Sequence, residues 1–291
     1  MPHDLARTVL GIRFQNPILL AAGTAGFGRE VAGVMDLERL GGIVTKAVSL
    51  EPRAGNPAPR VAEFPFGMLN SVGLANPGLA RVKADQLPWL ARHLCCARVL
   101  VNVVGGSPDE FAAVVQGLED CDGIAGYEVN LSCPNTSAGG LEFGADPASA
   151  ARVLARCRAR TRRPLFAKLS PALPDIGGMA EALRAAGADG ITVVNTIPGY
   201  LAGPDGRPRL GHGSGGVSGP ALLPVGVLAT RRVVERTGGT LPVIGVGGVR
   251  TADDVRQYLR AGASLVAIGT AALADPRLPE RVVRDLEVHG A

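Results

Sequence analysis

Eight short apolar segments, separated by stretches with helical patterns, constrain the fold more than any other feature. They are rich in Val, Ile and Leu and do not alternate with polar residues, which is typical of strands covered on both faces in a parallel sheet. Eight such units in 291 residues predict an α/β fold, a (β/α)8 TIM barrel, as one domain over 1–291. The segments are 16–23, 41–48, 98–105, 126–132, 164–170, 190–196, 242–248 and 265–273.

Helix signals lie between these segments. The stretch 146–161 opens with Asp and Pro, 173–189 ends near a glycine, and 251–264 opens with Thr and ends at Gly262. A doubly wound sheet is the alternative fold. It would place G-x-G-x-x-G after its first strand, and the glycines of "GTAGFG" (23–28) do not have that spacing.

Two insertions interrupt the alternation, at 51–75 and 197–222, and both are rich in Pro and Gly. Long connections without helix signals inside a compact domain are usually functional. In a barrel they follow strands two and six, at the C-terminal rim where active sites lie.

Composition excludes several classes of protein. No run of about 18 apolar residues is present, and the first residues lack a signal-peptide pattern, so we expect a cytoplasmic protein without membrane contact. The net charge is +4 without an extended basic block, which argues against nucleic-acid binding. The cysteines form no C-x-x-C pair, so no metal site is indicated, and we expect most of them to be small core residues. Those without an assigned role are Cys95, Cys96, Cys121 and Cys157.

Polar side chains gather at the predicted C-terminal ends of strands two to six. Two of only three lysines in the chain are among them. Glycines follow strands seven and eight, where barrels commonly bind phosphate through backbone N–H groups. The pattern predicts a phosphorylated ligand beside lysines and amides. The residues are Thr45, Lys46, Asn102, Asn130, Lys168, Asn195 and Thr196, with Gly247, Gly248, Gly269 and Thr270 at the phosphate.

Nine stretches carry a resemblance that spans nearly the whole chain: "NPILLAAGTAGFG", "GNPAPR", "GMLNSVGLANPG", "NLSCPNT", "AKLSP", "VVNT", "GGVSGPA", "GVGGV" and "AIGTA". They resemble the dihydroorotate dehydrogenase family, the flavin enzymes of pyrimidine synthesis. The form of "GNPAPRVAE" and "GMLNSVGLANPG", together with Cys133 where the membrane-bound class has Ser, is similar to class 1B. That resemblance implies FMN in this chain and oxidation of dihydroorotate to orotate. It also implies a homodimer of this chain within a heterotetramer, whose second subunit carries FAD and a 2Fe–2S cluster and reduces NAD.

The same resemblance implies roles for individual residues. Cys133 matches the base that takes a proton from the substrate, and 136–143 matches a glycine-hinged flap. Lys168 matches the lysine whose charge favours anionic reduced flavin. The substrate-binding positions are Lys46, Asn70, Val72, Gly73, Leu74, Asn130, Asn135, Asn195 and Thr196. The FMN-binding positions are Ala22, Thr45, Lys46, Asn102, Asn130, Lys168, Val194, Gly219, Gly247, Gly248, Gly269 and Thr270.

Other functions stay open at this stage. A fumarate-using class 1A enzyme, an FMN barrel like that of dihydropyrimidine dehydrogenase, and a dihydrouridine synthase share parts of the pattern. A non-catalytic barrel that binds a phosphorylated ligand, or a lyase that forms a Schiff base on Lys168, belongs to another class. This chain has neither iron–sulfur spacing nor a dinucleotide fingerprint, so a partner or a small acceptor must take the electrons.

Overall fold

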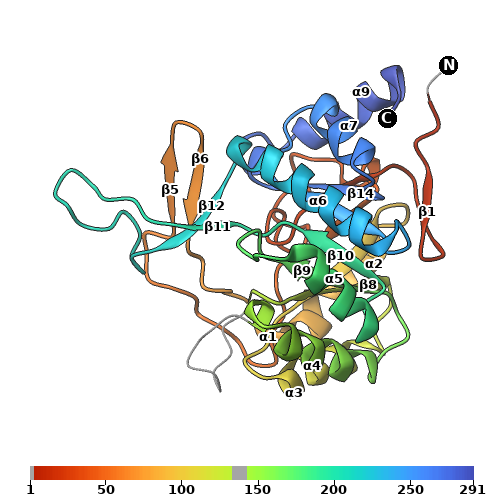
Figure 1. The fold of residues 1–291 in the computed structure, drawn as a ribbon, viewed down its shortest axis with the longest axis horizontal. Coiled ribbons are helices and arrows are strands. Elements are labelled where there is room, and N and C mark those ends of the chain that lie inside the picture. Colours follow the sequence, from red (N-terminus) through yellow and green to blue (C-terminus); the bar gives the residue numbers. More distant parts are fainter. Residues whose placement is uncertain (1–2, 133–142) are drawn as a thin grey trace.

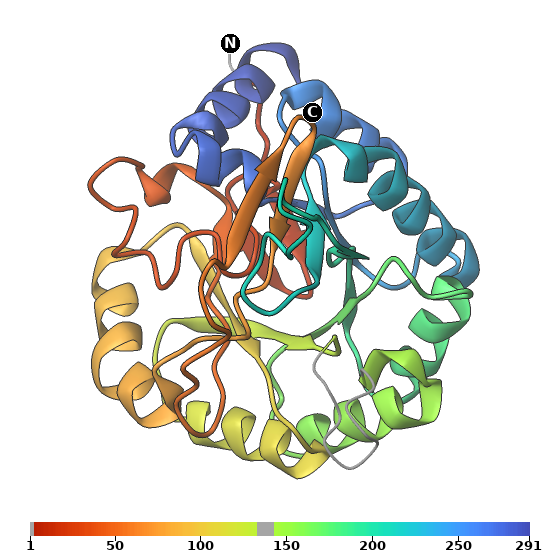
Figure 2. The same ribbon diagram turned by 90° about the vertical axis from the view of Figure 1, so that its left-hand side faces the viewer.

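The computed structural model describes residues 3–132 and 143–291, and its centre is a closed barrel of parallel strands. The barrel order is β10-β13-β14-β3-β4-β7-β8-β9, with helices around it (Figures 1 and 2), so the predicted (β/α)8 barrel is confirmed. The strands are β3 (Ile18–Leu20), β4 (Gly42–Val44), β7 (Arg98–Val103), β8 (Ile124–Asn130), β9 (Leu165–Leu169), β10 (Gly190–Val193), β13 (Val243–Val246) and β14 (Leu265–Ile268).

Helices follow most strands, and their predicted caps are present. The side chain of Asp146 accepts a hydrogen bond from the backbone of Ser149, and Thr251 forms a capping box with Asp254. Between β3 and β4, where every residue is described, only a 3-10 turn at Leu37–Arg39 replaces a helix. The α-helices are α1 (Gly78–Arg81), α2 (Leu87–His93), α3 (Pro108–Leu118), α4 (Pro147–Arg158), α5 (Ile176–Ala185), α6 (Leu223–Thr237), α7 (Ala252–Arg260), α8 (Thr270–Ala274) and α9 (Leu278–His289).

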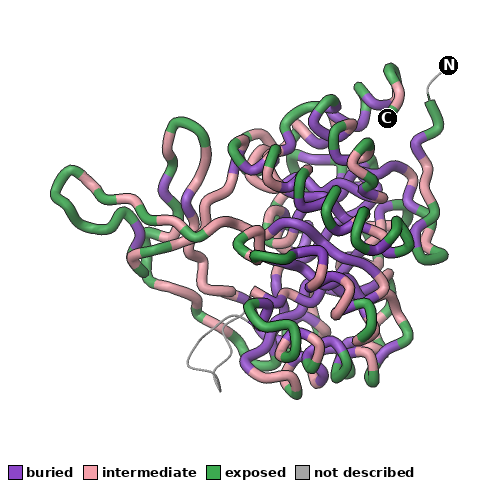
Figure 3. Tube along the Cα trace, viewed as in Figure 1, coloured by how far each residue is buried: buried purple, intermediate pink, exposed green. Residues whose placement is uncertain are grey.

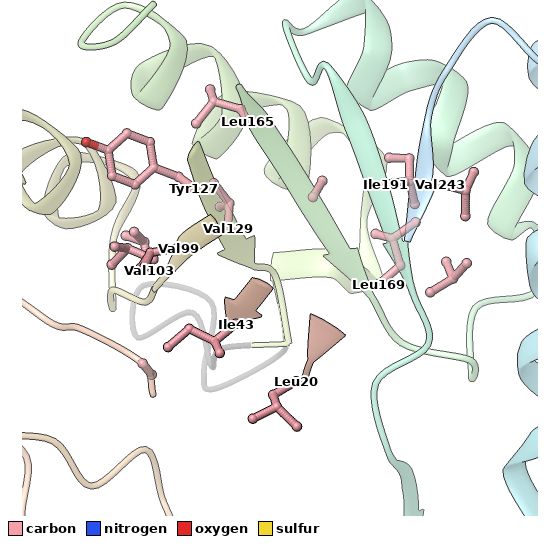
Figure 4. Packing of buried hydrophobic residues seen from close by; sticks show 14 of the residues in the cluster. Leu20, Ile43, Val99, Val103, Tyr127, Val129, Leu165, Leu169, Ile191 and Val243 are labelled. Atoms are coloured by element: carbon pink, nitrogen blue, oxygen red, sulfur yellow. The ribbon is translucent and has the colours of Figure 1, made fainter. Parts of the chain in front are cut away.

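The core has two layers because alternate residues of each strand face opposite sides. Outward residues such as Val99, Val129 and Leu165 pack under the helices (Figure 4). Inward residues fill the barrel itself. An N-terminal hairpin of β1 (Arg7–Val9) and β2 (Ile12–Phe14) adds Val9 and Phe14 to this inner cluster. The hairpin therefore closes the barrel at the N-terminal ends of its strands.

The two insertions join in one sheet, which the sequence did not predict. Strands β5 (Val61–Phe64) and β6 (Gly67–Asn70) come from the first insertion, β11 (Ile197–Gly199) and β12 (Gly215–Ser218) from the second. Their order is β11-β12-β6-β5, all antiparallel. We call this unit the arm sheet. It projects from the side of the barrel where the C-terminal strand ends lie, and its distal loops are largely exposed (Figures 1 and 3).

Two expectations were wrong in detail. The segment 265–273 is not one strand, because β14 ends at Ile268 and α8 begins at Thr270; both parts are apolar, so composition hides the boundary. Cys95 and Cys96 are exposed rather than buried in the core. Helix α2 ends at His93, and the chain turns at the surface before β7.

The remaining described cysteines lie deeper. Cys157 is buried and Cys121 is half-buried, and burial raises the pKa of the Cys157 thiol to about 12. Cys157 therefore has the core role expected of it. Within 3–132 and 143–291, no helix has the length and apolar character needed to cross a membrane.

Candidate active site

The inner wall of the barrel changes character around its circumference. Strands β13, β14, β3 and β4 contribute apolar inward residues. Strands β7 and β9 add Leu100 and Phe166 to this inner cluster, but strands β7 to β10 also contribute four buried polar residues, which are Asn102, Glu128, Lys168 and Thr192. Strand register pairs Asn102 with Glu128, and Lys168 with both Asn130 and Thr192. One side of the barrel therefore presents a continuous polar wall near its mouth.

Glu128 is the centre of this wall, although the sequence reasoning did not single it out. Asn102 Nδ2 donates to Glu128 Oε1 at 2.7 Å, and Lys168 Nζ lies 3.5 Å from the same oxygen. Asn102, Glu128 and Lys168 are 0%, 1% and 6% exposed, respectively. A signal was present: Glu128 is the one charged residue in an apolar strand, two positions before Asn130 and hence on the same face.

Thr45 links the end of β4 to β7. Its hydroxyl donates to the carbonyl oxygen of Lys46 at 2.9 Å, and it accepts from the backbone N–H of Asn102 at 3.3 Å. The backbone N–H of Lys46 donates to Gly26 at 2.7 Å. The Lys46 side chain is half-buried, and no acceptor in the described part of the chain bonds its ammonium. Hydrogen bonds to its carbonyl oxygen and from its N–H therefore hold the Lys46 backbone at the barrel mouth.

The predicted amides come together beside the polar wall. Asn195 Nδ2 lies 3.5 Å from Asn130 Oδ1, and the Asn195 side chain accepts from the backbone of Thr196 at 2.9 Å. Asn70 Nδ2 donates to Gly216 at 3.1 Å. A Cβ on Gly216 would lie 2.0 Å from Thr196 Oγ1, so the arm sheet lies against this group. Asn130, Asn195 and Thr196 therefore form one group, and Asn70 joins it through Gly216; we call these four residues the amide cluster.

The segment 72–74 has an unusual backbone. Gly73 and Leu74 both have positive φ, at 71° and 57°. Asn56 holds the segment by donating its backbone N–H to Val72 at 3.1 Å, and a Cβ on Gly73 would lie 2.5 Å from that nitrogen. No described acceptor bonds the N–H groups of Gly73 and Leu74. Left-handed geometry thus keeps these donors available for another acceptor.

Glycines line the opposite part of the rim. Gly247 and Gly248 have φ of +124° and +76°, and a Cβ on Gly248 would meet the backbone nitrogen of Leu223 at 2.3 Å. Thr270 Oγ1 donates to Ser218 Oγ at 2.8 Å, next to Gly219. These contacts bring together three loops that far-apart parts of the chain supply. We call this group the glycine cradle; it consists of Gly219, Gly247, Gly248, Gly269 and Thr270.

Tyr258 supports the cradle from below and was not predicted. Its hydroxyl donates to the carbonyl oxygen of Gly247 at 2.7 Å; the same hydroxyl leaves no room for a Cβ on Gly226, and the ring leaves none for a Cβ on Gly245. Burial raises the pKa of Tyr258 far above its usual range, so the hydroxyl stays protonated and remains a donor. This contact holds the backbone of the cradle in one conformation.

The remaining predicted positions fall into two groups. Ala22 is half-buried beside the inner cluster, and Val194 is buried and donates its N–H to Val246 at 2.9 Å. Cys133, Asn135 and the predicted flap up to residue 142 lie outside the described residues. Phe143, the last residue of that stretch, is buried and packs edge-on against Phe111.

Comparison with known proteins gives consistent matches over almost the full chain. A family model described as dihydroorotate dehydrogenase matches residues 4–289. A protein of Pelobacter propionicus is 42% identical over 288 residues, 99% of this chain and 93% of its own, and one of Desulforudis audaxviator is 45% identical over 288 residues, 99% and 92%. Both are named as dihydroorotate dehydrogenase B (NAD(+)), catalytic subunit.

A third relative, from Aquifex aeolicus, is 41% identical over 285 residues, 98% of this chain and 92% of its own. Its name assigns it provisionally to dihydroorotate dehydrogenase A (fumarate). With a closed barrel, a polar wall and a glycine cradle at its rim, and these matches from end to end, the chain belongs to the dihydroorotate dehydrogenase family.

Proposed function

We propose that this chain is the catalytic subunit of an NAD-linked dihydroorotate dehydrogenase that oxidises dihydroorotate to orotate with bound FMN. The observation that carries the proposal is the amide cluster of Asn70, Asn130, Asn195 and Thr196 beside Lys168. A cyclic ureide presents alternating donors and acceptors, and an asparagine side chain offers both. Catalysis by a Lys168 Schiff base fits less well, because Lys168 is 6% exposed and paired with Glu128.

The residues present fit FMN. Asn102 Oδ1 and Thr192 Oγ1 are buried without a hydrogen-bond partner among the described residues, so polar atoms remain at the wall for a ligand. The glycine cradle offers backbone N–H groups suited to a phosphate. When bound, FMN supplies the two-electron acceptor for the hydride that leaves the substrate.

The chain's own residues would bind the substrate and take its proton. Lys46 attracts the anionic substrate, while the N–H groups at 73–74 and the amide cluster orient its ring. Cys133 receives the proton from the carbon next to the carbonyl, and the hydride leaves the neighbouring carbon. Because a thiol ionises near pH 8.5, we expect the reductive half-reaction to accelerate from about pH 6 to 9.

Anaerobic mixing with dihydroorotate tests the proposal. Purified protein is expected to be yellow, and dihydroorotate but not dihydrouracil is expected to bleach its absorbance at about 450 nm. Cys133→Ala should slow bleaching by about a hundredfold or more, the scale expected for loss of a general base. Cys95→Ala, at an exposed position, is the matched control. A colourless protein, or equal rates for the wild type and Cys133→Ala, would contradict the proposal.

The route of the electrons is the second part of the proposal. The names of two relatives include the words catalytic subunit and NAD(+), which supports a partner subunit and NAD as the electron acceptor. We propose that this partner carries FAD and a 2Fe–2S cluster, in a heterotetramer built on a homodimer of this chain. The fumarate-type name of the Aquifex relative supports the alternative. Reoxidation of the reduced protein by fumarate alone would favour that alternative. We also propose a cytoplasmic location, which fractionation of native cells would test.

A further inference from the structure

We infer that Glu128 is a positioning residue that holds Lys168 and Asn102 for the flavin and offsets the Lys168 charge, so that it sets how easily the bound FMN is reduced. The inference rests on the proposed binding of FMN by this chain. It concerns a residue that contacts two candidate FMN ligands rather than the flavin. No step of the proposed reaction uses Glu128.

Strand register places Glu128 beneath Lys168. Glu128 lies opposite Phe166 on β9, whereas Asn130 lies opposite Lys168. Because the strands are parallel and inward positions recur every second residue, Glu128 is one inward position farther from the mouth than Lys168. Its Oε1 lies 3.5 Å from Lys168 Nζ. The carboxylate therefore holds the ammonium against the wall from the side away from the mouth.

The same oxygen orients Asn102. A carboxylate only accepts hydrogen bonds, so Asn102 must turn its Nδ2 towards Glu128, at 2.7 Å. Its Oδ1 is then left as a buried acceptor without a partner in the described part of the chain. Glu128 thereby decides that Asn102 presents an acceptor, rather than a donor, to a bound ligand.

Stability alone does not account for this arrangement. A buried ion pair is costly to desolvate, and apolar residues of similar volume often replace one without loss of stability. The opposite side of the same barrel is filled by apolar side chains such as Leu19, Ile244 and Leu265. A charged carboxylate kept at 1% exposure, in contact with two candidate FMN ligands, indicates a role in tuning their electrostatics.

The test is the midpoint potential of bound FMN, measured by anaerobic redox titration of the whole chain. Glu128→Gln keeps the size of the side chain and removes its charge. The positive charge of Lys168 is then no longer balanced by a neighbouring carboxylate, and it favours the more negative, reduced flavin. We expect the equilibrium between oxidised and reduced FMN to shift at least tenfold towards the reduced form, which is about 30 mV for two electrons.

Two further variants keep the test decisive. Glu128→Asp retains the charge at a greater distance and should shift the equilibrium in the same direction by less. Glu128→Gln in a Lys168→Met background should have a smaller effect than in the wild type, because the part that comes from holding the Lys168 ammonium is then absent. Glu119→Gln is the control, since Glu119 binds Tyr127 and Thr161 outside the barrel, at 2.6 and 2.8 Å.

The outcomes separate the two proposals. A wild-type chain that binds no FMN would overturn the proposed function, and this inference with it. A wild-type chain that binds FMN, with less than a twofold shift in Glu128→Gln, would overturn this inference alone. An equal shift in the Lys168→Met background, or in Glu119→Gln, would also overturn it.

Discussion

Gly248→Ala tests whether the glycine cradle requires a close backbone approach. Gly248 has φ of +76°, and a Cβ there would lie 2.3 Å from the backbone nitrogen of Leu223 and 2.7 Å from its Cα. The obstacle is backbone at the start of α6, so a side-chain rotation cannot relieve it. Gly239 is a matched control, because it has φ of +69° with nothing within 4 Å of its Cβ position.

The expected magnitudes differ between the two variants. A left-handed backbone costs an alanine about 1–2 kcal/mol at either position. At Gly248 the loop must also move by roughly 1 Å to reach ordinary contact, and overpacking of this kind adds ~1–3 kcal/mol. The difference between the variants is therefore ~1–3 kcal/mol in the free energy of unfolding. A chain of this size loses roughly 2–4 °C in Tm per kcal/mol.

Two assays on the same preparations measure these effects. Urea unfolding gives the difference in stability, and fluorescence titration with FMN gives Kd. We expect Gly248→Ala to weaken FMN binding by about tenfold or more, equivalent to ~1.4 kcal/mol, whereas Gly239→Ala binds FMN like the wild type. Equal stability of the two variants would refute the steric reasoning. Unchanged FMN affinity in Gly248→Ala would refute the assignment of the cradle to phosphate.

Three other predictions test separate parts of the structure. Phe14→Ala should lower the free energy of unfolding by ~3–5 kcal/mol without changing FMN affinity, because Phe14 is fully buried at the far end of the barrel; a weakened FMN complex would show that the hairpin reaches the site. Thr251→Ala should cost about 1 kcal/mol in urea unfolding, since it removes the N-cap of α7, and an unchanged midpoint would argue against the cap. At pH 8, Cys95 and Cys96 should react with a thiol reagent in the native protein, because both are exposed. Cys157 should not react, because its pKa is raised to about 12 and only about one thiol in ten thousand is then ionised. Mass spectrometry of labelled peptides measures both rates, and fast labelling of Cys157 would mean that its helix opens.

The barrel was predictable because strands covered on both faces must be apolar throughout. That requirement leaves runs such as 98–105 visible without any structural information. The rim residues were predictable for a related reason. Lysines and asparagines at the ends of apolar strands have few structural uses. The structure brings Asn102 and Lys168 into the polar wall and Asn130 and Asn195 into the amide cluster, whereas Lys46 lies apart from both at the barrel mouth.

The arm sheet was not predictable from local pattern. Its strands have only three or four residues, several of them glycine, and its central pairing joins Leu69 to Val217 across the chain. Nothing in either insertion alone specifies such a partner. Glu128 and Tyr258 were missed for a different reason: each acts through another residue, so its purpose appears only once its neighbour is placed.

The arm sheet also affects how this chain folds while it is being translated. Each insertion provides only a two-stranded hairpin, which is marginally stable alone in water. The first hairpin therefore has no lasting partner on the ribosome until the second has emerged, and the intervening chain includes four of the eight barrel strands, β7 to β10. During that interval, the exposed Val61 and Phe66 and an open strand edge are available to other nascent chains. Slow translation between the two insertions would lengthen the time in which the first hairpin can associate with other chains. A chaperone that binds the first hairpin early would reduce that association.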